Sequence, residues 1–399
     1  MENQSSKAVV VAGGVWQVPL IKFLKSKGHF VIVVDPFSNS EGVKICNQHI
    51  KCDVKDVDTI YNFLKNEKIQ FITTDQSDIS VNTVAKLNEL LGLPGNPFKI
   101  TNLFVNKLLM REHAQSFNVP CPLFKRISKI QELYDFIEIA KLPIIIKPAD
   151  SQSSRGIFKI ETLTDLESKF INSLEFSICK EVIAEQFIDG VEITAEGFCS
   201  NHKHITLCTS RKKHFRTGIA SELKYPADIP QEILTQVKRY NDVFVESTKL
   251  NFGITHAEYI IDLKTKNIFL IEIACRGGGS LISSDIIKWV SGVDVYEMFY
   301  QNLMGNETNV KNLFILNKSA ILYFFEFPDG VVKSIDGLDL FIEDSRVLDI
   351  KMFFNKGDLL KKASDDRSRQ GYFIGLGNNP DEIDDLVEFV KSNLKITYE

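Results

Sequence analysis

The sequence predicts a mixed fold, in which an α/β domain with a parallel sheet is followed by an α+β region. Strand and helix patterns alternate through residues 7–95, as they do in βαβ units. Further along, extended patterns follow one another across short polar turns, which is typical of antiparallel hairpins. The chain has 399 residues, too many for one ordinary core, so two or three domains are expected.

The first region carries three predicted strands and three predicted helices. A Gly13-Gly14 turn opens the first helix, and Asp35 ends the second strand, as in dinucleotide-binding domains. The G-x-G-x-x-G spacing is absent, so a substrate-facing or structural Rossmann-like domain is preferred over nicotinamide or flavin binding. The predicted strands are 7–12, 30–34 and 69–73, and the predicted helices are 17–27, 57–66 and 79–91.

A Gly95-Asn96-Pro97 segment is a plausible boundary after this region. The loop 149–156 is small and polar, with one glycine and one arginine, and it either covers a polyphosphate or forms a surface turn. It is not a Walker P-loop, because no Gly-Lys-Ser/Thr follows. The expected elements beyond the boundary are helices at 106–117 and 380–394 and strands at 142–147, 157–160, 182–187, 192–198 and 320–325.

Composition argues against several classes of partner. The 47 basic and 52 acidic residues are mixed along the chain and give a net charge of −5, so no nucleic-acid-binding footprint is present. Apolar runs are strand-sized, far below the ~20 residues of a membrane span, and the polar start lacks a signal-peptide core, so a cytoplasmic protein without a membrane partner is expected. The 7 cysteines include no C-x-x-C, which favours free thiols over a disulfide framework or a zinc site.

Two glutamates stand out in the segment 254–273, which has the pattern of a single hairpin. A turn centred on Thr265 would place Glu258 directly opposite Glu272. Like charges in cross-strand positions repel, so a cation is expected between them, and hard cations such as Mg²⁺ take oxygen ligands together with substrate phosphates. The alternative is a half-exposed hairpin whose glutamates point into water.

The residues after Glu272 favour the metal site. Arg276 supplies a fixed cation suited to a carboxylate or a phosphate. Gly277, Gly278 and Gly279 let backbone N–H groups approach an anion closely. A metal, an anion and a flexible loop together indicate nucleotide chemistry.

Taken in order, the motifs resemble those of the ATP-grasp superfamily. They are Lys107, Ile145-Ile146-Lys147-Pro148, the loop 149–156, Ala184-Glu185-Gln186-Phe187-Ile188-x-Gly190-x-Glu192, Glu258 and Glu272-x-x-x-Arg276-x-Gly278. The set is closest to the branch of L-amino acid ligases and carnosine-synthase-like enzymes, and more distantly similar to biotin carboxylase. The resemblance implies a Rossmann-like preceding domain at 1–95, a two-lobed ATP-grasp domain at 96–305 with a lid at about 124–190, and a small mixed C-terminal domain at 306–399.

The resemblance also implies a role for each matching residue. ATP and Mg²⁺ or Mn²⁺ are the implied cofactors, with Glu258 and Glu272 as metal ligands. Arg276 and Gly277 to Gly279 would bind the substrate carboxylate and its acyl phosphate. The implied ATP-binding residues are Lys107 and Lys147 for the phosphates, Ser153, Ser154 and Gly156 in the lid loop, Glu185, Gln186, Phe187 and Ile188 at the adenine hinge, and Glu192 for the ribose.

Two further residues are candidates for catalysis beside Arg276. His256 lies two residues before Glu258 on the same strand face and is a candidate acceptor for the proton of an amine, with a structural or substrate-orienting histidine as the alternative. The resemblance implies that the basic stretch 210–216 borders the active site, where Lys213 or Arg216 would reach substrate anions or phosphate, unless this stretch is a solvated loop. Ala274 departs from the family pattern, which has Asn there, so a second Mg²⁺ is expected to be looser or differently ligated.

The implied reaction is ATP-dependent ligation of a carboxylate to an amine through an acyl phosphate. The partners would be small molecules, with amino acids expected, and a homodimer is the commonest prior for an oligomer. Two alternatives stay open: a carboxylase-like enzyme that activates bicarbonate, and a nucleotide-binding protein without ligase activity.

Overall fold

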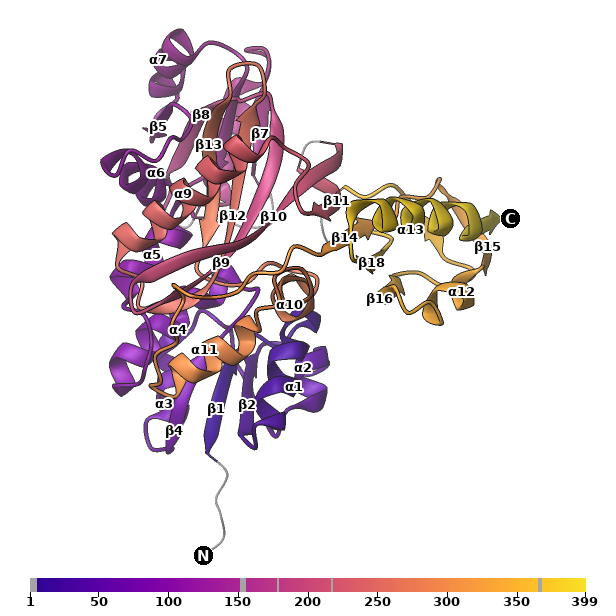
Figure 1. Cartoon of the computed structure of the whole chain (residues 1–399). Helices are drawn as coiled ribbons and strands as arrows, with labels where there is room; N and C mark the ends of the chain where they lie inside the picture. The colour runs from indigo at the N-terminus through magenta and orange to yellow at the C-terminus, as the bar shows by residue number, and fades with distance from the viewer. Residues whose placement is uncertain (1–5, 151–155, 178, 217, 365–367) are drawn as a thin grey trace, which may run out of the picture.

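The computed structural model describes residues 6–150, 156–177, 179–216, 218–364 and 368–399. Figure 1 shows the N-terminal sheet at one end, a strand-rich body stacked on it, and a C-terminal lobe that projects sideways. No helix in these described ranges is both long enough and apolar enough to cross a membrane.

The first sheet is parallel, in the order β3-β2-β1-β4, and confirms the predicted Rossmann-like start. Its strands present continuous apolar runs because helices cover both faces, and its core includes Val9, Ile32 and Ile72. The short α2 and β3 were not predicted from the sequence. The elements are β1 (Lys7–Val11), η1 (Val15–Gln17), α1 (Val18–Ser26), β2 (Phe30–Asp35), α2 (Glu41–Ile45), β3 (Gln48–Lys51), α3 (Val57–Leu64), β4 (Ile69–Thr73) and α4 (Asp78–Leu91).

A smaller antiparallel sheet, in the order β5-β8-β6-β7, lies within the range expected for the lid. Helices α7 and α8 pack on it around Phe136 and Phe170. Two helices, α5 and α6, connect it to the first region. The elements are α5 (Phe98–Val105), α6 (Lys107–Ser116), β5 (Phe124–Ile127), α7 (Ile130–Ala140), β6 (Ile144–Pro148), β7 (Phe158–Ile160), α8 (Leu166–Glu175) and β8 (Val182–Gln186).

The largest sheet has eight antiparallel strands in the order β13-β12-β9-β10-β11-β14-β18-β16. Its residues alternate between two cores, one of which faces the first region and contains Tyr225, while the other packs under α9 and contains Tyr259. The sheet therefore forms the floor on which the cleft described below is built. The elements are β9 (Val191–Ser200), β10 (Lys203–Arg216), β11 (Ile219–Tyr225), α9 (Gln231–Thr248), β12 (Phe252–Asp262) and β13 (Asn267–Ala274).

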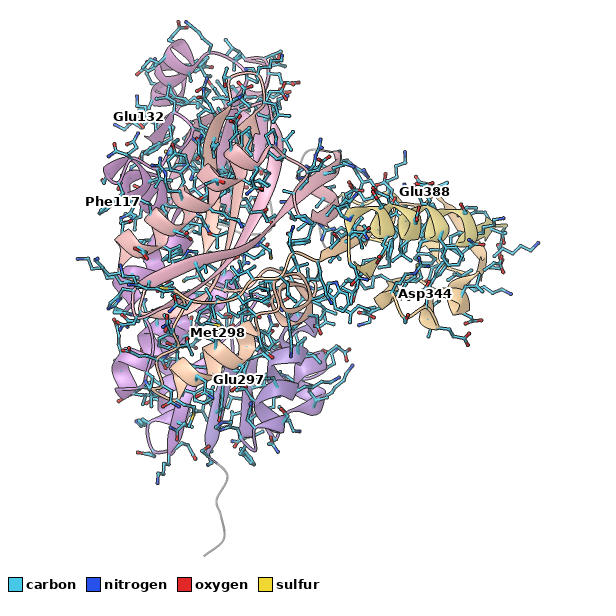
Figure 2. The ribbon with its side chains drawn as sticks, in the orientation of Figure 1. Phe117, Glu132, Glu297, Met298, Asp344 and Glu388 are labelled. Carbon is cyan, nitrogen blue, oxygen red and sulfur yellow. The ribbon has the colours of Figure 1, made fainter. Side chains whose placement is uncertain are left out.

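The remaining helices return the chain to the first region before the C-terminal lobe. Helix α11 packs near α1. Figure 2 shows Glu297 on α11, and Lys27 Nζ, at the end of α1, lies 2.6 Å from Glu297 Oε2. Strands β14, β16 and β18 extend the eight-stranded sheet, so the sheet continues past the boundary predicted at residue 305. The elements are η2 (Ile282–Ile286), α10 (Ile287–Ser291), α11 (Val295–Leu303), β14 (Ser319–Phe324), β15 (Gly330–Asp336), α12 (Leu338–Ile342), β16 (Val347–Met352), β17 (Leu359–Leu360), β18 (Gly371–Gly377), α13 (Pro380–Asn393) and β19 (Lys395–Tyr398).

Candidate active site

A cleft of about 980 Å³ lies between the small and the large sheet. This volume is at the upper end of ligand pockets, which span roughly 300–1,000 Å³. Its wall combines residues from the first region, helix α6, the strand β6, the segment after β8 and the strands β10, β12 and β13. The sequence-predicted residues that line it are Lys107, Lys147, Glu185, Gln186, Phe187, Ile188, Glu192, Lys213, His256, Glu258, Glu272, Arg276 and Gly279.

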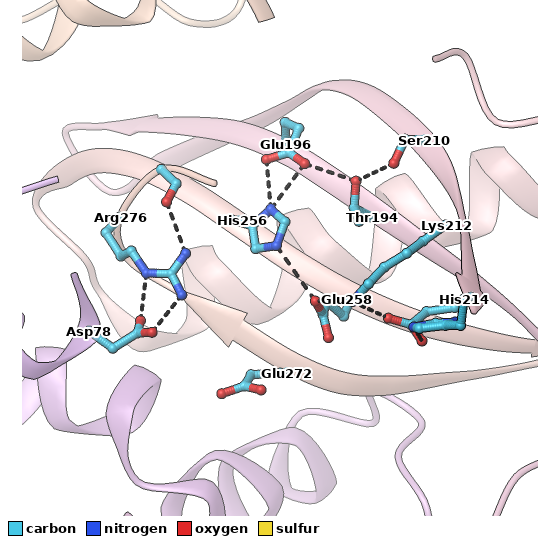
Figure 3. Close-up of polar contacts among 12 residues, drawn as sticks. Asp78, Thr194, Glu196, Ser210, Lys212, His214, His256, Glu258, Glu272 and Arg276 are labelled. Carbon is cyan, nitrogen blue, oxygen red and sulfur yellow. Dashed lines mark hydrogen bonds and ion pairs between the residues drawn. The ribbon is translucent and has the colours of Figure 1, made fainter. Parts of the chain in front are cut away.

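The two glutamates of the hairpin are cross-strand partners, as predicted. Glu258 on β12 pairs with Glu272 on β13, and Figure 3 shows both carboxylates on the same side of the hairpin. The register shifts between Glu258 and Tyr259, so that Tyr259 pairs with Leu270. The turn is centred half a residue before Thr265, which alone would have placed Glu258 opposite Ile271. The bulge inserts one extra residue on β13 and so brings Glu272 opposite Glu258. The pairing was therefore predicted correctly from a slightly wrong turn.

Each of these carboxylates has a lysine ammonium group beside it. Lys107 Nζ lies 3.2 Å from Glu272 Oε1, and Lys212 Nζ lies 2.7 Å from Glu258 Oε1. Burial raises the pKa of Glu258, but the charges of Lys212 and His256 outweigh it and hold the pKa well below its usual value. Glu258 is therefore ionised at neutral pH and available as a hard oxygen ligand.

A buried ion cluster holds Lys147 in the cleft wall. Glu185 Oε2 lies 2.7 Å from Lys147 Nζ, and Glu185 Oε1 accepts a hydrogen bond of 2.7 Å from Arg111 Nε. All three side chains are nearly inaccessible to solvent. Burial raises the pKa of Glu185, but the charges of Arg111 and Lys147 outweigh it and keep the carboxylate ionised. Sequence reasoning missed Arg111, because its contact with Glu185 joins residues 74 positions apart and leaves no local pattern.

The segment after β8, where the adenine hinge is predicted, lines the cleft. The Gln186 N–H donates to Leu123 O at 2.8 Å and the Phe187 N–H to Pro143 O at 3.2 Å, which fixes the backbone on the cleft side. The predicted lid residues Ser153 and Ser154 lie outside the described residues, and Gly156 is buried with a φ of +71° that favours glycine.

Two lysines of the basic stretch on β10 line the cleft, but Lys212 and not the predicted Lys213 contacts the site carboxylates. Lys213 Nζ pairs with Glu222 Oε1 at 2.7 Å and its side chain is 56% exposed. Lys212 is 15% exposed, and its Nζ lies 2.6 Å from Glu192 Oε1 as well as near Glu258. Successive residues of a strand point to opposite faces. Deciding whether Lys212 or Lys213 faces the site carboxylates therefore requires the strand register, which the sequence pattern did not supply.

His256 lies between two carboxylates. Its Nδ1 is 2.9 Å from Glu196 Oε2, and its Nε2 is 3.8 Å from Glu258 Oε1. Burial lowers the pKa of His256, but Glu196 and Glu258 outweigh it and raise the pKa to about 9. The ring therefore already carries its proton at neutral pH, so the structure does not support the predicted role as an acceptor for the proton of an amine. Figure 3 shows Thr194 and Ser210 continuing this network behind Glu196.

Arg276 grips a carboxylate of the first region. Its Nε donates to Asp78 Oδ1 at 2.6 Å and its Nη2 to Asp78 Oδ2 at 2.5 Å, while Nη1 donates to Gly277 O at 2.9 Å. These contacts use three of the five N–H groups of a guanidinium. The Gly277 N–H donates to Asp75 Oδ1 at 2.7 Å. A Cβ added at Gly277 would lie 2.3 Å from Ser283 Cβ, so this close approach requires glycine.

The donor set fits a single divalent cation held together with phosphates. Glu258 and Glu272 supply hard oxygens, and the nearby lysines supply charge for phosphate groups. Within the part of the chain that the structure describes, no group of three or more His, Cys, Asp and Glu side chains is arranged to hold a metal alone. Ala274, where the family pattern has Asn, is the cross-strand partner of His256. The loose second Mg²⁺ stays a prediction.

The Gly13-Gly14 turn of the first region is held by hydrogen bonds within the chain rather than arranged for a dinucleotide. Asp35 is 6% exposed and accepts hydrogen bonds from Gly13 N at 2.8 Å, Phe37 N at 2.9 Å and Ser40 Oγ at 2.8 Å. The Gly42 N–H donates to Gly13 O at 2.7 Å, so α2 closes over the turn. The groups that a dinucleotide would need are therefore used by the chain itself.

Comparison with known families decides what this geometry belongs to. Residues 140–285 match the model of the ATP-grasp domain, and residues 323–399 match the model of the L-amino acid ligase C-terminal domain 2. The chain contains an ATP-grasp domain. The resemblance drawn from the ordered motifs is confirmed, and so are the fold class and the assignment to ATP-grasp ligases.

Relatives of this ATP-grasp protein are distant. The formate-dependent phosphoribosylglycinamide formyltransferase of Methanocaldococcus jannaschii is 25% identical over 269 residues, which cover 61% of this chain and 69% of that protein. The carbamoyl phosphate synthase large chain of Clostridium acetobutylicum is 20% identical over 295 residues, which cover 72% of this chain but only 27% of that protein. The L-amino acid ligase structure from Bacillus licheniformis superposes with a TM-score of 0.83 at 18% identity and covers 100% of both chains, which shows a shared fold.

Proposed function

We propose that this ATP-grasp protein is an ATP-dependent carboxylate–amine ligase. It would transfer the γ-phosphoryl group of ATP to a carboxylate, and an amine would then displace phosphate to give an amide or peptide bond. The observation that carries the proposal is the pairing of Glu258 with Glu272 on adjacent strands, with the ammonium groups of Lys212 and Lys107 beside them. The match of the C-terminal segment to an L-amino acid ligase domain favours amino acids as substrates.

Lys107 and Lys147 would bind the phosphates of ATP. Phosphoryl transfer depends on positioning and charge neutralisation rather than on covalent help from the protein. Lys147 is held by Glu185, which is fixed in turn by Arg111, so its ammonium group is positioned before the nucleotide arrives. A divalent cation held by Glu258 and Glu272 would neutralise charge on the phosphate oxygens.

The segment 185–192 would hold the nucleoside. The backbone of Gln186, Phe187 and Ile188 borders the cleft and would read the adenine edge, while the carboxylate of Glu192 would accept hydrogen bonds from the ribose hydroxyls. Lys212 and His214 lie against Glu192 at 2.6 and 3.3 Å, which orients this carboxylate.

Arg276 would bind the substrate carboxylate and stabilise charge on the acyl phosphate. Asp78 holds the guanidinium in one plane, and two N–H groups beyond its three contacts are available in its donor set. Of the three predicted glycines, Gly279 lines the cleft and would let the backbone approach the same anion, whereas the Gly277 N–H is already bound to Asp75. In the second step the amine nitrogen bonds to the acyl carbon, the carbon–oxygen bond to phosphate breaks, and the amine proton leaves to solvent.

The test is phosphate release by the purified chain with ATP, Mg²⁺ and pools of amino acids, followed by mass analysis of the products. Release that depends on both a carboxylate and an amine, with a new amide product, supports the ligase. For Glu→Gln variants of Glu258 and Glu272, Glu246→Gln is the matched control, because Glu246 pairs with Lys203 outside the cleft. Release with bicarbonate alone would indicate the carboxylase-like alternative, and ATP binding without release would indicate a binding protein.

A further inference from the structure

Lys212 contacts two carboxylates of the cleft, and the proposed reaction gives its ammonium group no role beyond orienting Glu192 and lying beside Glu258. Its Nζ lies 2.7 Å from Glu258 Oε1 and 2.6 Å from Glu192 Oε1, and the side chain is 15% exposed. Figure 3 shows Lys212 reaching toward Glu258 from its strand. A buried ammonium group requires such partners, because an uncompensated charge in the interior is costly.

Under the proposed function, both carboxylates that contact Lys212 also bind a ligand. Glu258 would ligate the divalent cation, and Glu192 would bind the ribose. The ammonium group within 2.7 Å of Glu258 Oε1 therefore occupies the electrostatic position of a metal ion on that oxygen. A lysine is suited to such an exchange, because its compact charge sits on a flexible stem that can turn to a new partner.

We propose that Lys212 is the internal counter-ion of the metal site: it competes with the divalent cation for Glu258 in the free protein and turns to the nucleotide phosphates when metal and nucleotide bind together. The inference rests on the proposed function only for the metal role of Glu258 and Glu272. Because the ammonium group must leave Glu258 before a cation binds, the free protein binds divalent cations weakly. Polyphosphate supplies the negative charge that Lys212 then needs, so metal and nucleotide bind with positive coupling.

The experiment measures Mn²⁺ binding by the loss of the free-ion spin-resonance signal, with and without ADP. In Lys212→Met, which keeps the length of the stem and removes the charge, Mn²⁺ alone should bind about tenfold more tightly than in the wild type, while the Mn²⁺·ADP complex should bind about tenfold more weakly. Lys203→Met is the matched control. Lys203 lies on the same strand and also pairs with a glutamate, Glu246, but outside the cleft, so neither affinity should change.

Unchanged or weaker binding of Mn²⁺ alone to a folded Lys212→Met protein would overturn the inference. If that variant does not fold, Glu192→Gln provides a second test, because it leaves the ammonium group to Glu258 alone and should weaken binding of Mn²⁺ alone by about threefold. Tighter binding in Glu192→Gln would contradict the competition. These readouts need no turnover, so a chain that binds Mn²⁺ in this way but joins no carboxylate to an amine would refute the ligase and leave the inference standing.

Discussion

Asp35 at the end of β2 and Glu258 on β12 are both ionisable side chains near glycine-containing loops, but their partners differ. The carboxylate of Asp35 accepts three hydrogen bonds from two backbone N–H groups and a serine hydroxyl of its own region. Glu258 lies against the side chains of Lys212 and His256 and faces a second carboxylate across the hairpin. Backbone donors cannot leave, whereas a lysine ammonium group can turn to a phosphate. The nature of the partner therefore separates a structural carboxylate from one that can take a ligand.

The largest expected effect concerns the hairpin carboxylates. Glu258→Gln and Glu272→Gln should each lower ATP-dependent phosphate release by a factor on the order of 10²–10³, because each removes a charged oxygen where charge must be neutralised. Initial rates with a substrate pair found in the pool screen check this. If either variant keeps more than half of the wild-type rate, the hairpin is not the metal site.

The next effect concerns stability behind the cleft. Arg111→Met should lower the free energy of unfolding by about 3–5 kcal/mol, because it leaves Glu185 buried with only one cation. Urea unfolding followed by circular dichroism measures the loss. Lys203→Met removes an exposed ion pair and should cost less than about 1 kcal/mol. Equal losses in the two variants would contradict the assigned role of Arg111.

Arg276→Lys tests whether the bidentate contact with Asp78 positions Arg276 for the substrate carboxylate. A lysine keeps the charge but loses the bidentate grip on Asp78. The KM for the carboxylate substrate should rise about tenfold, while the KM for ATP stays within about twofold. A change confined to ATP would place Arg276 at the nucleotide rather than at the substrate.

Asp35→Asn tests whether the carboxylate of Asp35 has a purely structural role. It should cost about 1–3 kcal/mol of stability, because the acceptor of three buried donors is weakened. Mn²⁺ affinity and the KM for ATP should match those of the wild type when measured on the folded fraction. A selective loss of nucleotide binding would assign the glycine turn a ligand after all.

A smaller effect appears with pH. Burial raises the pKa of Asp78, but Arg276 outweighs it and holds the pKa below the ordinary value of 3.8. The stability from this ion pair is therefore fully present above the unfolded pKa and is lost as the pH falls through the folded pKa. The stability gap between wild type and Asp78→Asn should be about 1–3 kcal/mol at pH 6 and should shrink toward acid in urea titrations. A gap that widens toward acid would have the wrong sign.

Local pattern was enough to predict most of the fold. Strand β4 begins and ends where expected, and the facing of Glu258 and Glu272 follows from one hairpin. Element α2 and strand β3 have only five and four residues, too few for a periodic pattern to show.

Long-range geometry accounts for what the sequence did not predict. The contact of Arg276 with Asp78 joins residues 198 positions apart, and that of Arg111 with Glu185 joins residues 74 apart. The choice of Lys212 over Lys213 depends on strand register. None of these features leaves a trace in local periodicity, because each is set by how the sheets and α6 pack together.

We propose that Glu258 and Glu272 together hold a divalent cation with the nucleotide. The most direct test is Mn²⁺ titration in the presence of ADP for the wild type, Glu258→Gln, Glu272→Gln and the control Glu246→Gln. The wild type and the control should each bind one Mn²⁺ tightly, and either hairpin variant should bind it at least about 30-fold more weakly. Equal Mn²⁺ affinity in all four proteins would show that the two glutamates do not hold the cation.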